Sequence, residues 1–317
     1  MTNIIDFDDQ LYLPVVYKLK FPKYDWVFID EAQDISSIQH VMLERSLNKG
    51  GRLVAVGDSH QAIYSFRGAD SNSLNKIVET FNCIRLPLSI SYRCPKSVVA
   101  EAKQYVPHIE AAPTATEGSV VDSGVANNIK LYNPEESVMV VCRNNAPLLR
   151  LAYFLIAAKV PVRVEGREIG EGLANLIKKL RARTIHDLGP RLEEWHARET
   201  AKKLAVDKSA DLSAIDDKYE CLLCLLESTQ AQTVPELINE VKNLFDPKPG
   251  KKYVICSTIH RAKGLESEKV FFLDSWRLPS KYAKTEEQLQ QEHNLAYVAV
   301  TRAKQSLHYV NFPKEAK

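Results

Sequence analysis

Short apolar runs rich in β-branched and aromatic residues recur along the chain and alternate with amphipathic stretches. These runs are typical of strands, and they cover residues 25–30, 52–58, 137–143, 161–166, 253–258, 269–274 and 306–311. Helical patterns lie between them, for example at 35–47 and 94–105. Because strands that alternate with helices form parallel sheets covered on both faces, this order predicts an α/β fold.

The strand pattern is interrupted once, at 166–248, where amphipathic helical patterns replace it. This segment is predicted to be a helical insertion, with residues 246–252 as the return linker and 111–128 as a connector between two sheet domains. The predicted domains are a first sheet domain at 1–110, a second at 111–165 and 249–317, and the insertion at 166–248.

Composition places the chain among ordinary globular proteins. Its 317 residues are 45% hydrophobic and 26% charged, with a net charge of +2, so a nucleic-acid-binding surface would have to be local. No apolar run reaches the ~18 residues of a membrane span, and the acidic N-terminus lacks a secretory pattern. Of six cysteines, Cys221 and Cys224 form an isolated CxxC, which favours buried thiols over a zinc site. We expect an intracellular, reduced protein.

Acidic side chains follow the first predicted strand, where Asp30 and Glu31 precede Asp34. Open α/β sheets bind ligands at the carboxyl ends of their strands. An acid there can hold Mg²⁺, and a neighbouring Glu can orient and deprotonate an attacking water. A solvated turn after a strand is the alternative. The second strand also ends in polar residues, Asp58 and then Gln61, and a Gln can sense a γ-phosphate or its water.

Aromatic and cationic residues follow this second strand. Tyr64 and Phe66 precede Arg67, an arrangement that suits stacking on single-stranded bases at ~1–3 kcal/mol per base. The alternative for both aromatics is a place in the core. Farther on, Tyr92 precedes Arg93, and an Arg can stabilise charge on a transferring phosphoryl group. A surface Arg is the alternative there.

Six blocks in a fixed order resemble the motifs of superfamily 1 DNA helicases of the UvrD/Rep type. IDEAQD, VGDSHQAIYSFRGA and LPLSISYRCP resemble motifs II, III and IV, and VVCRNNAPL resembles the start of the second RecA-like domain. STIHRAKGLESEKVFFLD resembles motif V, and QEHNLAYVAVTRAKQSL resembles motif VI. DFDDQL resembles an element that precedes motif II. The resemblance implies RecA-like parallel sheets of the P-loop NTPase type, with the first domain incomplete and the second complete around the insertion.

The resemblance also implies roles on the nucleotide side. Asp30 would coordinate Mg²⁺, Glu31 would activate the hydrolytic water and Gln61 would read the γ-phosphate of ATP. Arg93 and Arg302 would reach that phosphate from opposite sides of an interdomain cleft. The remaining nucleotide-binding positions are Tyr92 beside the adenine, Glu266 at the ribose, and Gly264, which completes the motif V turn with Lys263.

On the DNA side, Tyr64 and Phe66 would stack on bases. Thr258 and His260 would lie near the DNA backbone and couple it to the nucleotide. His260 satisfying a buried carbonyl and Lys263 as a solvated charge are the alternatives. Two departures from the family pattern weaken such contacts: His293-Asn294 replaces a pair of arginines, and Ser267 replaces the aromatic residue of motif V.

A phosphate-binding loop is absent from this sequence. ATP hydrolysis needs GxxxxGK[ST], whose backbone N–H groups cradle the phosphates, and PGKK at 249–252 lacks its upstream Gly and its Ser or Thr. We therefore expect the carboxyl part of a helicase, whose partner polypeptide carries the missing half. Loss of core strands would leave a sheet edge and apolar surface exposed.

The predicted function is that of an ATP-dependent DNA helicase or translocase acting on single-stranded DNA, 3′→5′ by resemblance, with weak or no ATPase alone. The insertion is shorter than the accessory domain of the best-known relatives, which leaves strand separation open. The alternative is a catalytically dead module that binds single-stranded DNA or a protein. An unrelated α/β domain with chance matches is a third possibility.

Overall fold

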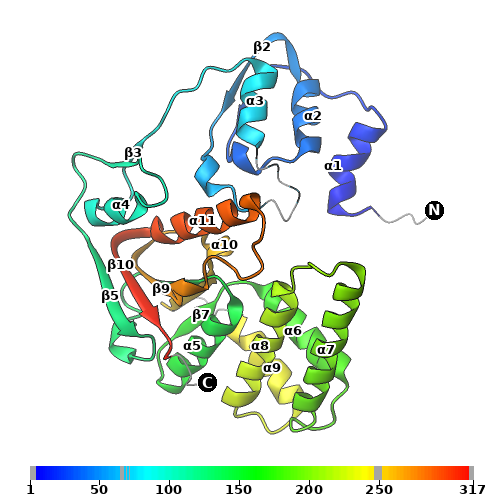
Figure 1. The fold of residues 1–317 in the computed structure, drawn as a ribbon, viewed down its shortest axis with the longest axis vertical. Coiled ribbons are helices and arrows are strands. Elements are labelled where there is room, and N and C mark those ends of the chain that lie inside the picture. The colour runs from blue at the N-terminus through cyan, green and yellow to red at the C-terminus, as the bar shows by residue number, and fades with distance from the viewer. Residues whose placement is uncertain (1–4, 65–67, 69, 71, 246–251, 314–317) are drawn as a thin grey trace. The chain divides into compact units, whose positions relative to one another are not determined.

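The computed structural model describes residues 5–64, 68, 70, 72–245 and 252–313. The chain forms two compact units, Met1–Leu88 and Ser89–Lys317, called unit 1 and unit 2 below (Figure 1). No helix in these ranges is long and apolar enough to cross a membrane. Phe66 and Arg67 lie outside the described residues, as does most of the predicted linker 246–252.

Unit 1 contains two parallel strands with helices beside them (Figure 1). In chain order its elements are α1 (Phe7–Val16), β1 (Tyr24–Ile29), η1 (Ala32–Asp34), α2 (Ser37–Ser46), β2 (Leu47–Ala55), η2 (Ser59–Gln61) and α3 (Ser73–Phe81). A capping box starts α2, because Ser36 accepts from the Gln39 backbone and Gln39 accepts from the Ser36 backbone. The expected helix at 35–47 is thereby confirmed.

The two faces of this sheet differ in exposure. Strand side chains alternate between faces, and Val27 and Ile29 on one face are partly buried. On the other face, Trp26 is 51% and Phe28 71% exposed, and their rings stack 5.9 Å apart. Val54, paired with Phe28 across the ladder, is also exposed. Unit 1 therefore presents an open apolar sheet face to solvent.

Unit 2 is built on a six-stranded sheet in the order β5-β10-β9-β6-β8-β7, in which every pairing is parallel. Its strands are β5 (Ser119–Val125), β6 (Val138–Cys142), β7 (Val162–Val164), β8 (Val254–Thr258), β9 (Ser267–Leu273) and β10 (Ala303–Asn311). Every residue of β6 is buried, as expected for a central parallel strand. The predicted α/β class is confirmed.

Further helices and short elements of unit 2 lie outside the six-stranded sheet, and the two short strands among them pair with each other in a separate sheet. They are β3 (Ile90–Ser91), α4 (Lys96–Ala102), β4 (Glu110–Ala111), η4 (Ile129–Leu131), α5 (Asn145–Ala157), α10 (Ile259–Ala262), η5 (Ser275–Arg277) and α11 (Glu286–Val300). Strand β5 lies inside the segment 111–128 that was expected to be a connector. It is an edge strand with mostly exposed or half-buried side chains, and its pattern is therefore weaker than that of a buried strand.

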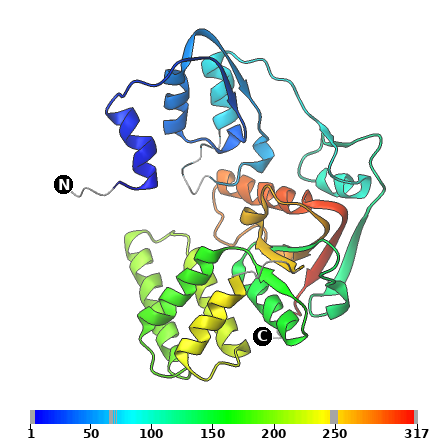
Figure 2. The same cartoon turned by 180° about the vertical axis from the view of Figure 1, so that it is seen from behind.

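Between β7 and β8 the described residues form four helices, which Figure 2 shows grouped together: α6 (Arg167–Leu180), α7 (Leu188–Val206), α8 (Ser213–Ser228) and α9 (Val234–Phe245). One apolar cluster joins them to the sheet layer, because Leu192 and Leu225 belong to the same buried cluster as Val140 of β6. Cys221 and Cys224 are buried on α8, and their expected burial is thereby confirmed.

Candidate functional site

The first candidate residues lie at the carboxyl end of β1. Backbone pairing continues past the strands, since Val56 N–H donates to Ile29 O at 2.8 Å and Ala32 N–H donates to Val56 O at 2.9 Å. Between these bonds Glu31 adopts a left-handed conformation, with φ of 50°. Its N–H donates to Asp30 Oδ1 at 2.9 Å. The turn thus fixes the backbone of both acids while their side chains stay exposed.

Gln33 connects the two strand ends, and its side chain is buried. Its Nε2 donates to Glu31 Oε2, and its Oε1 accepts from Asp58 N–H at 3.0 Å. A Cβ at the neighbouring Gly57 would lie 2.5 Å from Gln33 Oε1, so a larger residue there would displace the Gln33 side chain. The sequence singled out the acids around Gln33 but missed Gln33 itself, whose signal was a polar residue placed between two acids.

Gln61 joins the same set through Asp58. Its Nε2 donates to Asp58 Oδ2 at 2.9 Å, while Asp58 Oδ1 accepts from His60 N–H at 2.9 Å. Glu31 and Gln61, which were expected to act together, are therefore linked in unit 1 through Gln33 and Asp58. Tyr64 is half-buried at the end of this loop.

A buried hydrogen bond from Ser73 stabilises the turn after β1. Ser73 Oγ, at the start of α3, donates to Ala32 O at 2.6 Å, and His40 Nε2 of α2 lies 3.2 Å from Ser73 Oγ. Burial lowers the pKa of His40, although the nearby Asp70 carboxylate opposes this effect. A neutral His40 at physiological pH therefore suits this packing.

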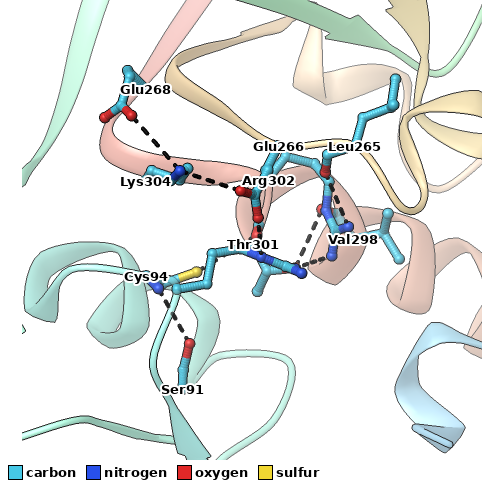
Figure 3. Close-up of polar contacts among 10 residues, drawn as sticks. Ser91, Cys94, Leu265, Glu266, Glu268, Val298, Thr301, Arg302 and Lys304 are labelled. Atoms are coloured by element: carbon cyan, nitrogen blue, oxygen red, sulfur yellow. Dashed lines mark hydrogen bonds and ion pairs between the residues drawn. The ribbon is translucent and has the colours of Figure 1, made fainter.

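Unit 2 brings two charged candidates, Arg93 and Glu266, together with Lys304, and Figure 3 shows the contact between Glu266 and Lys304. Arg93 Nε donates to Glu266 Oε2 at 2.9 Å, and Lys304 Nζ lies 3.2 Å from Glu266 Oε1. Lys304 also lies 3.8 Å from Glu268 Oε1. The bond from Lys304 is the main cause that lowers the pKa of Glu266, with Arg93 contributing. Lys304 was not singled out from the sequence.

Arg302 is 1% exposed, and three of its hydrogen bonds are to residues of unit 2. Figure 3 shows its guanidinium near Val298, Leu265 and Thr301. Its Nε donates to Val298 O at 2.9 Å, its Nη1 to Leu265 O at 3.3 Å and its Nη2 to Thr301 Oγ1 at 3.1 Å. These bonds connect α11 to the segment that carries Glu266.

The remaining candidates lie around α10 and near β3. Thr258 is buried at the N-cap of α10, and His260 is half-buried within that helix. Lys263 follows the helix, and Gly264 has φ of 82°, a conformation that favours glycine. Tyr92 is 81% exposed. Ser267, a departure from the family pattern, is buried and its Oγ donates to Ser137 O at 2.7 Å.

A partly buried ion pair that the sequence did not reveal joins the end of β6 to α11. Arg143, just after β6, contacts both carboxylate oxygens of Glu292 through Nε at 3.1 Å, and its Nη2 lies 2.8 Å from Oε1. Ser280 N–H donates to Glu292 Oε2 at 2.9 Å. The partners are 149 residues apart in sequence, so no local pattern predicts the pair.

The residues of unit 1 fit a magnesium ion bound mainly by phosphate and water. Mg²⁺ sites of this kind use one or two protein carboxylates. Asp30 is exposed, and the only hydrogen bond to its carboxylate in the described part of the chain is the one from Glu31 N–H to Oδ1. Within those same ranges no three His, Cys, Asp or Glu residues converge, so Asp30 would act with phosphate oxygens rather than in a protein cage.

The chain is similar to known DNA helicases. Residues 2–82 match the UvrD/REP helicase N-terminal domain, and residues 195–312 match the UvrD-like helicase C-terminal domain. The F-box DNA helicase protein 1 of Schizosaccharomyces pombe is 26% identical over 93% of this chain and 35% of its own length. The ATP-dependent DNA helicase UvrD2 of Mycobacterium tuberculosis is 25% identical over 89% of this chain and 46% of its own length.

A probable DNA helicase II homolog of Mycoplasma capricolum is 23% identical over 96% of this chain and 58% of its own length. The chain thus spans between about a third and somewhat over half of these relatives. The similarity extends over almost all of the 317 residues.

Proposed function

The chain belongs to the UvrD/Rep family of DNA helicases, and we propose that it forms the part of an ATP-dependent DNA motor that activates the hydrolytic water and holds single-stranded DNA. The contact series from Glu31 through Gln33 and Asp58 to Gln61 carries this proposal. These contacts link the Glu31 carboxylate, after β1, to the Gln61 amide, after β2, so that a movement of one side chain can be passed to the other. A motor that couples phosphate sensing to water activation needs such a link.

On the nucleotide side, each side chain is assigned one task. Asp30 holds the magnesium ion, which neutralises charge on the phosphates when bound. Glu31 orients the attacking water and accepts its proton, and Gln61 reads the γ-phosphate. Arg93 and Arg302 stabilise the charge that develops on that phosphate. Adenine and ribose lie beside three further residues, Tyr92, Glu266 and Gly264.

The state of Arg93 bears on this assignment. Its guanidinium is paired with Glu266, which Lys304 also contacts. Because both side chains of the Arg93 pair are about 40% exposed, the pair is screened and weak. Lys304 can keep Glu266 compensated when Arg93 turns toward a phosphate, so the release of Arg93 costs little.

On the DNA side, Tyr64 and Phe66 stack on unpaired bases, and Thr258 and His260 lie near the backbone. Thr258 suits a coupling role because it lies at the N-cap position of α10, at the carboxyl end of β8 and ahead of the turn at Gly264. Translocation runs 3′→5′, by analogy with the family. The domains extend over 1–110, over 111–165 with 249–317, and over the insertion 166–248.

A polypeptide that carries the phosphate-binding loop is the proposed partner, joined to these residues or separate from them. The 317 residues contain no GxxxxGK[ST]. The open sheet face of unit 1, with Trp26, Phe28 and Val54 exposed, supports such a partner. Parallel sheets are normally covered on both faces, and burying a large apolar side chain contributes about 1.5–3 kcal/mol.

Because its relatives act on DNA, we place the protein inside the cell.

The test is ATP hydrolysis with and without single-stranded DNA. The chain is assayed alone and with a loop-carrying segment taken from a UvrD-type relative. The proposal predicts negligible turnover by the chain alone and DNA-stimulated turnover in the mixture above that of the segment alone. Robust hydrolysis by the lone chain would refute the need for a supplied loop.

The rival function is a catalytically inactive module that binds single-stranded DNA or a protein. The absence of the loop from these residues favours it. It predicts that DNA binding by the chain is measurable while no supplied segment yields DNA-stimulated hydrolysis.

A further inference from the structure

Inside unit 2, Cys94 joins the segment that carries Arg93 to the turn that carries Arg302 (Figure 3). The Cys94 side chain is 3% exposed, and its Sγ donates to Thr301 O at 3.5 Å. Thr301 is the C-cap of α11 and directly precedes Arg302. One buried hydrogen bond therefore connects the residue after Arg93 to the residue before Arg302, across 207 positions of the sequence.

The backbone is held on both sides of this bond. Cys94 N–H donates to Ser91 Oγ at 3.3 Å, which closes a turn that contains Arg93. Pro95, the next residue, lies close to Gly118, where a Cβ would come within 2.4 Å of Pro95 Cγ. Gly118 has φ of 62°, a conformation that favours glycine. A larger residue at Gly118 would therefore displace the segment that follows Arg93.

The two arginines are held in different ways. The guanidinium of Arg302 is buried and donates three hydrogen bonds within unit 2. The side chain of Arg93 is 40% exposed and pairs with Glu266, in a contact that solvent screens. Because this pair holds the Arg93 side chain only weakly, the place from which the side chain starts matters. That place is set by the turn that Cys94 anchors.

The Cys94 side chain acts as a neutral donor. Burial raises the pKa of its thiol, against the opposing effects of the Ser91 hydrogen bond and of the Arg93 and Arg302 cations. A raised pKa keeps the S–H group protonated at neutral pH, as donation to a carbonyl requires. An S–H group is a weak donor, and the hydroxyl of a serine in its place could donate in the same way.

We propose that Cys94 is a positioning residue that holds Arg93 in a fixed place relative to Arg302, so that unit 2 presents both guanidinium groups to one phosphate. This inference rests on the proposed function, which assigns both arginines to the γ-phosphate. The resemblance implied that they reach it from opposite sides of an interdomain cleft, whereas both belong to unit 2. Cations placed in advance stabilise developing charge without rearrangement during the reaction.

The test uses the chain together with a loop-carrying segment of a UvrD-type relative, and it measures DNA-stimulated ATP hydrolysis. Cys94→Ala removes the donor to Thr301, and Cys94→Ser keeps one. The control is Cys221→Ala, which removes a thiol that is 1% exposed on α8 of the helical insertion. Thermal unfolding followed by circular dichroism checks that all three variants fold.

Cys94→Ala is expected to lower kcat about 10–100-fold and to change KM for ATP less than about twofold, because a misplaced Arg93 weakens binding of the transition state. Cys94→Ser is expected to stay within about threefold of the parent kcat, since its hydroxyl can donate to the same carbonyl. Cys221→Ala is expected to match the parent chain. A role in folding alone would not separate kcat from KM in this way.

Arg93→Ala shows whether Cys94 acts through Arg93. Adding Cys94→Ala to Arg93→Ala is expected to lower kcat by less than about a further twofold, because residues that act as a unit are not additive. A loss in Cys94→Ala that serine does not restore, or that multiplies with the loss in Arg93→Ala, would overturn the proposal.

Equal rates for Cys94→Ala and Cys221→Ala would also overturn it. If Arg93→Ala is slow in that case, the proposed function stands and only the positioning role of Cys94 is refuted. If the parent chain adds no DNA-stimulated hydrolysis to that of the segment alone, both are refuted.

Discussion

At the residue scale, the candidate site depends on Gln33, whose side chain contacts Glu31, Asp34 and the backbone of Asp58. Its carbonyl holds the backbone of Asp58, and its amide holds the carboxylate of Glu31. A buried polar group that loses its partner keeps its desolvation cost and gains nothing in return. The orientation of the proposed general base therefore depends on a side chain that touches no substrate.

Replacing Gln33 by Ala is expected to destabilise unit 1 by about 1–3 kcal/mol, because the Asp58 N–H loses its acceptor in a buried place. Urea unfolding followed by circular dichroism measures the change. Gln10→Ala, at an exposed position of α1, is the matched control and should change stability by less than about 0.5 kcal/mol. Equal stabilities for the two variants would show that the Gln33 bonds contribute nothing.

His40 gives unit 1 a pH dependence of known sign. Its folded-state pKa is lowered from 6.5, chiefly by burial, so the unfolded chain takes up the proton more readily. Stability from neutral His40 is therefore fully present above pH 6.5 and declines as the pH falls below that value. His308, whose pKa burial also lowers, adds a similar effect in unit 2.

Thermal unfolding of the chain and of His40→Gln between about pH 7.5 and 5.5 separates the two histidines. The variant is expected to lose less stability on acidification than the parent chain, and His308 contributes to the loss that remains. Parallel curves for parent and variant would contradict the assigned role of His40.

At the scale of elements, the sequence predicted most of the fold because buried parallel strands are nearly continuous apolar runs. It found β1, β2 and the strands from β6 to β10, but it missed β5, whose edge position leaves its side chains too exposed for a clear pattern. The acids at the strand ends were found because they directly follow these apolar runs. Their link through Gln33, and the pairing of Arg143 with Glu292, depend on tertiary contacts that no local pattern records.

The pair of Arg143 and Glu292 fixes the end of β6 against α11. Arg143→Ala leaves a carboxylate that is 7% exposed without its cation, and this is expected to cost about 3–5 kcal/mol of stability. Urea unfolding of unit 2, read by circular dichroism, measures the cost. The double variant Arg143→Met/Glu292→Leu removes both charges and should recover most of the loss. A double variant no more stable than Arg143→Ala would contradict the desolvation argument.

At the scale of the whole molecule, the chain combines a well-covered parallel sheet in unit 2 with an open apolar sheet face in unit 1. Exposed apolar patches of this kind mark interaction surfaces. The matched regions cover between 35% and 58% of the lengths of the curated relatives. A loop-carrying polypeptide bound to this face would cover the exposed apolar side chains and would also complete the phosphate site.

Trp26→Ser/Phe28→Ser is expected to lower the binding of a hydrophobic dye to the chain and to abolish its activation by a loop-carrying segment, since both side chains are more than half exposed. Trp276→Ser, at an exposed position of unit 2, is the control and should leave activation intact. Dye fluorescence and DNA-stimulated ATP hydrolysis are the readouts. Unchanged activation of the double variant would show that the partner does not bind the open face.

The central claim is that Glu31 activates the hydrolytic water, and one measurement tests it most directly. DNA-stimulated ATP hydrolysis is measured for the chain supplied with a loop-carrying segment, then for Glu31→Gln and for Glu79→Gln, an exposed carboxylate on α3. Removal of a general base predicts a rate about 10²–10⁴-fold lower for Glu31→Gln and an unchanged rate for Glu79→Gln. Equal rates for all three proteins would contradict the account.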